Sequence, residues 1–301
     1  MKLVLVGALA AWLISSSAVA QPAAVDRGAH PAVSPDGAYI AFLSNRSGQS
    51  QVFVIRTDGT HERQLTASPE EKNPPHWMDR KTIAFSLTES DDSRLFAIDL
   101  GAKNLREIGR VPGRNPIPSP DGKRVIYMVG PWTATRFVLS GLHNEDPRQL
   151  TDGSSTTWTP AWSPDEKRIA FTRRDENWLK VWVMSADGSS PTPVSHVPHE
   201  EGQAQFPAWS AEGKRLAVQV NGGAKDKPTA HIWTIDLASD AAQKLSAHDQ
   251  PYLDETPSWF PDGTRIAFQS NRRNTDWGNP DVTVTVTLLV AGPPAPVAVM
   301  V

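Results

Sequence analysis

The stretch T-P-A-W-S-P-D-E-K-R-I-A-F, residues Thr159–Phe171, contains the pattern that decides the fold. Pro160 and Trp162 are two residues apart, so an extended backbone places both side chains on one face. The S-P-D sequence that follows favours a tight turn, because proline presets φ at the first corner and an aspartate side chain can bond nearby amides. Arg168–Phe171 then has the largely apolar character of a returning strand. The stretch therefore predicts a β-hairpin.

The same phrase occurs six times along the chain, which predicts a repeat protein. Its Trp position is filled in turn by Val33, Trp77, Pro118, Trp162, Trp209 and Trp259. Successive steps between these positions are 44, 41, 44, 47 and 50 residues. Repeats of this length made of short strands are typical of a β-propeller with one four-stranded sheet per repeat. We therefore predict an all-β fold, a six-bladed β-propeller of four-stranded antiparallel blades.

The repeat spacing also predicts the limits of the blades. They are expected at about 28–66, 72–111, 113–151, 157–196, 204–246 and 254–301. In the last blade we expect the third strand at Asp281–Val290 and the fourth at Pro296–Val301. Its Val-Thr alternation favours strands, although its apolar residues lack the pattern of the other blades. Whether this blade closes the ring stays open.

The N-terminus has the features of a secretory signal peptide. An apolar run from Leu3 to Ile14 follows Lys2, and the segment ends with Ala18-Val19-Ala20. The run is too short to span a bilayer, and the ending matches an A-x-A cleavage site. We therefore expect a signal peptide at residues 1–20, a propeller at 21–301, a periplasmic or secreted location and no membrane span after cleavage.

The composition narrows the classes of partner. The chain has no cysteine, so its stability in an oxidising compartment must come from packing. The formal net charge is −3, and no basic cluster of the kind that binds nucleic acid is present. We expect a monomer that binds no nucleic acid.

The connections between strands indicate where recognition would occur. In an antiparallel blade the first and third turns lie on one face, and here they are short and stereotyped. The other connections vary in length, and rigid scaffolds usually carry recognition on such loops. Their acids outnumber their bases, and aromatic rings beside acids suit a protein, peptide or glycan partner. The expected ligand-binding residues on this variable face are Trp132, Trp158, Trp178, Tyr252, Trp277 and Glu255.

The four tryptophans of the repeat have a different expected role. Trp77, Trp162, Trp209 and Trp259 are predicted to lie between adjacent blades, where each buries a large ring. Val33 and Pro118 replace them in two blades.

Two connections also suggest a possible divalent cation at the mouth of the central channel. The candidate ligands are His199, Glu200, Glu201, His248, Asp249 and Asp254. Mixed nitrogen and oxygen ligands suit a transition metal or Ca²⁺. A solvated acidic loop is the preferred interpretation, because no ligand spacing recurs, so no cofactor is expected by default. His30 is interpreted as a hydrogen-bonded residue at a strand start.

The sequence P-x-W-S-P-D-G-x-x-I-A-F, followed by an aspartate-glycine turn and an L-T strand, resembles the WD40-like (PD40) repeat of the TolB family of propellers. The resemblance covers nearly all of the chain after residue 20 but only the propeller part of TolB. It implies a propeller fold and, as an expectation, a place in the bacterial envelope.

These observations lead to one main functional hypothesis and two alternatives. The chain lacks a G-x-S-x-G elbow, an H-E-x-x-H motif and a phosphate loop, so no catalytic residue is assigned. The main hypothesis is a non-enzymatic binding module for a protein, peptide or glycan of the cell envelope. The alternatives are a metal-dependent propeller lyase or hydrolase that uses the His and carboxylate cluster, and a scaffold subunit without a ligand.

Overall fold

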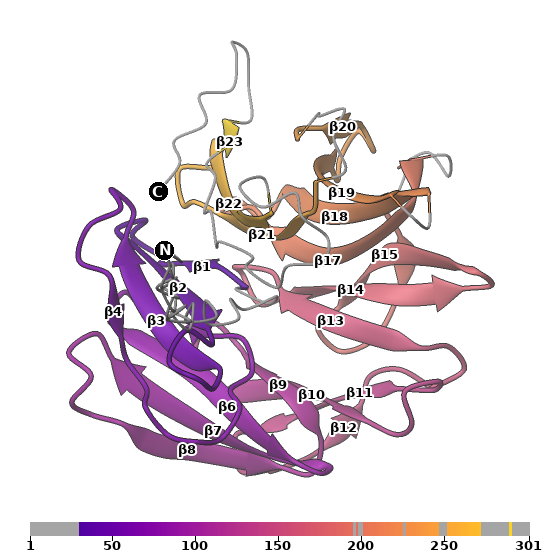
Figure 1. Cartoon of the computed structure of the whole chain (residues 1–301). Coiled ribbons are helices and arrows are strands. Elements are labelled where there is room, and N and C mark those ends of the chain that lie inside the picture. The colour runs from indigo at the N-terminus through magenta and orange to yellow at the C-terminus, as the bar shows by residue number, and fades with distance from the viewer. Residues whose placement is uncertain are drawn as a thin grey trace, which may run out of the picture.

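The computed structural model describes residues 30–194, 197, 201–224, 227–246, 252–271 and 289–290, which form a ring of β-sheets (Figure 1). Each repeat contributes one antiparallel sheet, and the chain passes from sheet to sheet in sequence order. The first strand of each repeat lies toward the centre of the ring and the last lies outside. The protein is therefore an all-β propeller.

The first three blades contain twelve strands. They are β1 (Ala32–Val33), β2 (Tyr39–Ser44), β3 (Gln51–Arg56) and β4 (Arg63–Gln64); β5 (His76–Trp77), β6 (Thr82–Glu89), β7 (Asp92–Asp99) and β8 (Arg106–Val111); and β9 (Arg114–Pro118), β10 (Arg124–Val129), β11 (Arg136–Gly141) and β12 (Arg148–Gln149).

The other three sheets contain eleven strands. They are β13 (Thr157–Trp162), β14 (Arg168–Asp175), β15 (Trp178–Ser185) and β16 (Thr192–Pro193); β17 (Gln203–Trp209), β18 (Arg215–Ala224), β19 (Lys227–Asp236) and β20 (Ala242–Lys244); and β21 (Asp254–Trp259), β22 (Arg265–Ser270) and β23 (Leu289–Val290).

The prediction of six four-stranded blades is wrong. The described residues form five four-stranded blades, and the last repeat forms a three-stranded sheet of β21, β22 and β23. Strand β23 has two residues and pairs only with Arg265 and Ile266 of β22. The predicted fourth strand, Pro296–Val301, lies outside the described residues. The Val-Thr alternation carried a strand propensity, but propensity without a buried apolar pattern does not specify a complete blade.

The S-P-D turns are held by one repeated hydrogen-bond pattern. Ser163 Oγ donates to Asp165 Oδ1 at 2.6 Å, and the Arg168 amide donates to Ser163 Oγ at 2.9 Å. The serine hydrogen bond is the main cause that lowers the pKa of the Asp165 carboxyl. Ser34 and Ser119 make the same two hydrogen bonds in blades one and three. The buried serine hydroxyl thus joins both ends of each tight turn.

The recurring tryptophans connect neighbouring blades, as predicted. The indole Nε1 of Trp77 donates to Ala32 O at 2.8 Å, and that of Trp209 donates to Ala161 O at 3.0 Å. Trp162 makes the equivalent bond to Ile117 O at 3.3 Å. Each bond runs from the first strand of one blade to the first strand of the preceding blade. These bonds set the distance between the strands that surround the axis.

Arginines at the start of the second strand add a second connection. Arg168 lies 4.5 Å from the Trp209 ring centroid and bonds Gly213 O at 2.5 Å. Arg215 repeats this one sheet later, 4.7 Å from the Trp259 ring and 2.6 Å from Gly263 O. The three-stranded sheet therefore packs on blade five in the same way as the blades pack on one another.

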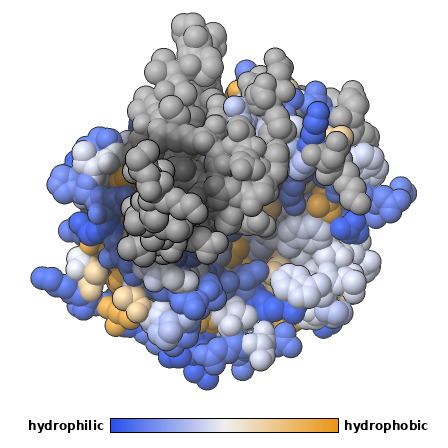
Figure 2. All heavy atoms as spheres, in the orientation of Figure 1, coloured by the Kyte–Doolittle hydropathy of each residue, from blue (hydrophilic) through white to orange (hydrophobic). Residues whose placement is uncertain are grey.

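The three-stranded sheet also contacts blade one. The Val33 amide donates to Ser258 Oγ at 3.1 Å, and Phe260 packs with Ile40 and Ala267 in a buried cluster. The ring is therefore closed by packing between β1 and β21. Hydrophilic residues cover most of the outer rim that Figure 2 shows. Within the described ranges, no helix is both long and apolar enough to cross a bilayer.

Candidate functional site: a proline-lined central channel

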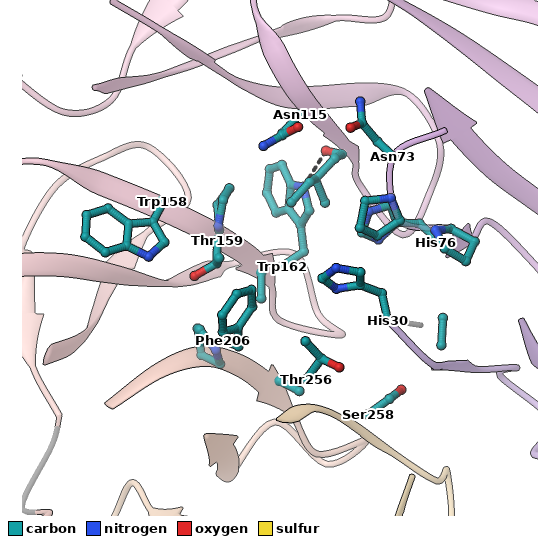
Figure 3. A pocket seen from close by; sticks show the side chains of 18 of the residues that line it. His30, Asn73, His76, Asn115, Trp158, Thr159, Trp162, Phe206, Thr256 and Ser258 are labelled. Carbon is teal, nitrogen blue, oxygen red and sulfur yellow. Dashed lines mark hydrogen bonds between the residues drawn. The ribbon is translucent and has the colours of Figure 1, made fainter. Parts of the chain in front are cut away.

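A cavity of about 1330 Å³ lies at the centre of the ring. The first strands of all six sheets line it, so it is the central channel of the propeller (Figure 3). Each repeat contributes the proline of its P-x-W phrase to the wall; these are Pro31, Pro75, Pro116, Pro160, Pro207 and Pro257. Since proline has no amide hydrogen, these positions leave no backbone donor unpaired, and their rings make much of the wall apolar.

The residue before each of these prolines has an unusual backbone conformation in five repeats. Its φ is positive, and the five values are 41° for His30, 47° for Asn115, 50° for Thr159, 52° for Phe206 and 49° for Thr256. The pairing register shifts at this point in β9, β13, β17 and β21, which marks a bulge in each strand. The bulge places the residue on the wall of the channel.

Blade two departs from this arrangement. Its corresponding residue is Pro74, whose ring holds φ negative, and Pro75 follows it. The next residue, His76, lines the channel where other repeats carry Ala32, Ile117 or another small or aliphatic side chain. Burial lowers the pKa of His76 to about 4, and the nearby His30 adds to the effect. His76 is therefore a neutral imidazole at pH 7, able to donate one hydrogen bond and accept another.

Polar side chains from several strands face the same space. Figure 3 shows His30, Thr159, Phe206 and Thr256 around the cavity, with Asn115 and His76 farther along its wall. The rings of His30 and Phe206 lie 6.3 Å apart between centroids. Thr159 Oγ1 bonds Thr172 Oγ1 at 2.8 Å, whereas Thr256 Oγ1 is buried and has no hydrogen-bond partner within the described residues.

The only charged lysine or arginine side chains that line the channel, within the described residues, are Lys72 and Arg174. Lys72 is 5% exposed, and its Nζ donates to Ser68 O at 2.6 Å and to Glu70 O. Burial lowers the pKa of Lys72. No carboxylate is among the described lining residues. Apart from these two cations, the described lining of the channel offers neutral hydrogen-bonding groups between apolar surfaces.

Tryptophans beside arginines border the channel on the side of the variable loops. Arg114 lies 4.3 Å from the Trp132 ring centroid, and Arg174 lies 5.9 Å from that of Trp158. Arg114 is held in place by Gly130 O and by Asp91 at 3.4 Å. Trp132 is 62% exposed although it lines the channel. A large exposed ring at the entrance of a cavity is suited to contact with a ligand.

The residues expected to bind a ligand do not gather in one place. Trp132 and Trp158 line the channel, whereas Trp178 is exposed at the start of β15 and does not. The carbonyl of Tyr252 accepts a hydrogen bond from the Ala230 amide. Glu255 receives hydrogen bonds from Gln219 and Gln269, and burial raises its pKa. Trp277 lies outside the described residues.

The structure describes only two of the expected metal ligands. Glu201 Oε2 pairs with Lys244 Nζ at 3.0 Å, and Asp254 Oδ1 accepts from Ser270 Oγ at 2.6 Å. The other four, which are His199, Glu200, His248 and Asp249, lie outside the described residues. No three His, Cys, Asp or Glu side chains gather as a metal site in the described part of the chain.

Comparison with known proteins agrees with the β-propeller fold. The TolB β-propeller domain family matches residues 19–212 and 143–282, which together span most of the chain. The chain belongs to this family.

Curated relatives resemble parts of the chain. An uncharacterized protein of Agrobacterium fabrum is 24% identical over 204 residues, which are 62% of this chain and 67% of that protein. A TolB homolog of Chlorobium luteolum is 30% identical over 134 residues, which are 44% of this chain and 27% of that protein. The matched region is thus less than a third of the TolB homolog.

Solved structures share the propeller. TolB from Acinetobacter baumannii superposes with a TM-score of 0.66 at 19% identity, over 85% of this chain and 62% of that chain. An oligogalacturonate lyase in complex with manganese superposes with a TM-score of 0.55 at 15% identity, over 82% of this chain and 72% of that chain. At these identities the likeness shows the fold alone. The TolB-like fold therefore occurs in proteins with different activities.

The sequence pattern places His30 at the channel mouth, although it favours a strand-start role for that residue, and His30 does line the channel. The pattern does not predict that Asn115, Thr159, Phe206 and Thr256 also line it. One signal was present in the repeats: the position before the recurrent proline changes its residue type while the proline stays. When the residue type changes between repeats at one position while the next position is always proline, the changing side chain is one that the fold itself does not require.

Proposed function

We propose that this TolB-family propeller is a non-enzymatic binding module of the periplasm or the extracellular space. Its central channel would receive a segment of an envelope protein or a peptide. The observation that carries the proposal is the channel of about 1330 Å³ with neutral hydrogen-bonding groups on a proline-rich wall. A space of this size, mostly apolar with a few placed polar groups, has the usual character of a ligand site.

The bordering residues support entry from the variable-loop face. Trp132 and Trp158 bring large rings to this end of the channel, and each has an arginine against it. Tryptophan and arginine are frequent among residues that dominate binding energy at protein interfaces. Because the Arg114 guanidinium already contacts the Trp132 ring, both side chains have little conformational freedom left to lose on binding.

Two exposed tryptophans provide a matched test. Trp132 lines the channel, whereas Trp178, 37% exposed, does not. The purified protein, immobilised and exposed to envelope extract, should capture a partner whose affinity falls about tenfold or more with Trp132→Ala. Trp178→Ala should leave the affinity within twofold of the wild type. Loss with Trp178→Ala alone would contradict the channel as the binding site.

A metal-dependent lyase or hydrolase is the second candidate. The fold likeness to a manganese-containing oligogalacturonate lyase favours it. Metal analysis of the purified protein separates the two proposals: bound metal that is lost with His199→Ala and Glu201→Ala supports the enzyme, and a metal-free protein that captures a partner supports the binding module.

A further inference from the structure

The left-handed residues of the channel wall occupy an unfavourable conformation. A following proline drives the residue before it toward extended backbone angles. Thr159 and Thr256 are β-branched and Phe206 is bulky, and such residues rarely adopt a positive φ. Glycine would adopt this conformation freely, yet none of the five positions carries glycine. The backbone conformation at these five positions would favour glycine, so it does not explain why they carry larger side chains.

What these five residues share is the surface that they reach. His30, Asn115, Thr159, Phe206 and Thr256 all line the channel, and they come from five different repeats. Other non-glycine residues with positive φ, such as Ala102 and Ser190, are exposed and do not line this channel. Strained conformations tend to be kept where a side chain serves binding or catalysis.

One of the five carries a buried polar group without a partner in the described residues. The Thr256 hydroxyl is buried and makes no hydrogen bond there. Burying an unpaired hydroxyl is unfavourable, and Thr256 combines this with a positive φ. Both features oppose stability, so they are expected to persist only if a ligand uses them.

We propose that these five positions form a specificity ring, one residue from each of five repeats, that selects the segment entering the channel. The inference rests on the proposed binding function and names the residues that discriminate between ligands. The bulge and the positive φ direct each side chain toward the axis of the propeller. A substitution at one of these five positions can therefore alter which ligand is bound, while the proline and tryptophan that hold the blades together stay the same.

The chemistry of the ring favours an uncharged, proline-rich or otherwise apolar extended peptide. The amide of Asn115 and the hydroxyls of Thr159 and Thr256 can meet main-chain N–H and C=O groups. Phe206 and the neighbouring prolines can pack on apolar side chains. Beside the five uncharged ring residues a basic side chain would meet no carboxylate, and the buried Lys72 Nζ already donates to Ser68 O and Glu70 O, so a charged side chain is disfavoured there. A sugar chain would need a partner for many hydroxyls, and a proline-lined wall supplies few.

The test compares two double variants that relieve the same backbone strain. Thr159→Gly with Thr256→Gly removes two ring side chains, and Ala102→Gly with Ser190→Gly removes two side chains at exposed left-handed turns. Both double variants should melt close to the wild type, because in the ring variant the relief of two positive φ angles by glycine offsets the loss of the 2.8 Å hydrogen bond between Thr159 Oγ1 and Thr172 Oγ1. A melting temperature well below that of the wild type for the ring variant alone would overturn the strain argument.

The binding probe is a phage-displayed library of random dodecapeptides, with a glycan array as the second arm. The wild type and the turn variant should enrich the same uncharged, apolar-rich sequences. For a synthetic peptide of the enriched sequence, the ring variant should lose about tenfold in affinity, as expected from two lost hydrogen bonds.

The outcomes separate the two proposals. If the wild type enriches peptides and the ring variant binds them equally well, the specificity ring is wrong and the binding module stands. Enrichment of charged peptides, or selective binding to glycans, overturns the ligand class assigned to the ring. If the wild type binds neither probe, the binding function fails and the inference fails with it.

Discussion

At the scale of single residues, the channel contains side chains that the fold does not require. His76 takes a position that small or aliphatic residues occupy in other repeats, and its imidazole faces the cavity. The positive φ of Thr256 and its unpaired hydroxyl are likewise unfavourable for stability. Sites of this kind are common where binding and stability conflict.

The titration of His76 gives a prediction about stability. Its pKa of about 4 in the folded protein lies below the ordinary value of 6.5, so folding disfavours protonation. The stability that depends on a neutral His76 is present above pH 6.5 and is lost as the pH falls toward 4. Its full size is on the order of 3 kcal/mol.

Denaturant unfolding of the wild type and of His76→Gln at pH 7 and at pH 4.5 measures this effect. The wild type should lose more stability between the two pH values than the variant does. The exposed-turn change His143→Gln should keep the wild-type pH dependence. Equal losses in all three proteins would show that the burial of His76 does not oppose its protonation.

At the scale of elements, the β-hairpin of three repeats is held by one serine hydroxyl. Ser163 Oγ accepts from the Arg168 amide and donates to Asp165, so a single buried side chain connects the strand, the turn and the returning strand. This arrangement recurs at Ser34 and Ser119. The S-P-D phrase therefore acts through its serine as much as through its proline.

Ser163→Ala should reduce the free energy of unfolding by about 1–3 kcal/mol, because the Arg168 amide would lose a buried acceptor. Ser189→Ala is the matched control: its hydroxyl bonds Asp187 at 2.6 Å in an exposed turn, where water can replace it. The control should change stability by less than about 0.5 kcal/mol. Thermal unfolding measures both, and a control that costs as much as Ser163→Ala would refute the role of burial.

At the scale of the whole molecule, the propeller is held together by contacts between sheets. Tryptophans bond the backbone of the preceding repeat and arginines bond that of the following repeat, and these bonds run around the axis. The three-stranded sheet is bonded to both of its neighbours. Arg215 of blade five donates to Gly263 O of this sheet, and Ser258 Oγ of this sheet accepts from the Val33 amide of blade one. Closure therefore depends on its first two strands, and β23 adds only two residue pairs.

A comparison of two tryptophans measures how much one inter-blade hydrogen bond contributes to the free energy of unfolding. Trp209 Nε1 bonds Ala161 O, whereas Trp259 Nε1 has no partner in the described part of the chain. The two side chains are similarly buried, at 8% and 7% exposure. Trp209→Phe should therefore destabilise the protein by about 1 kcal/mol more than Trp259→Phe. Chemical denaturation measures the difference, and equal effects would mean that ring packing alone joins the blades.

The sequence alone predicted the β-hairpin, the repeat, the family and the inter-blade tryptophans. Each of these follows from local chemistry that recurs at a fixed spacing, such as Pro160, Trp162 and the S-P-D turn. Because the same pattern occurs in every repeat, local signals that are weak in one repeat become reliable when the repeats are compared.

Only the tertiary structure showed which residues meet at the axis and how many of the sheets in the described ranges have four strands. Thr159 and Phe206 are 47 residues apart in sequence, yet a bulge before a proline brings both to one cavity. The last repeat has strand propensity, but a complete blade depends on apolar packing that propensity does not encode. The lining of the channel and the completeness of a blade depend on contacts between segments that are distant in sequence. The pattern of one segment alone therefore does not predict them.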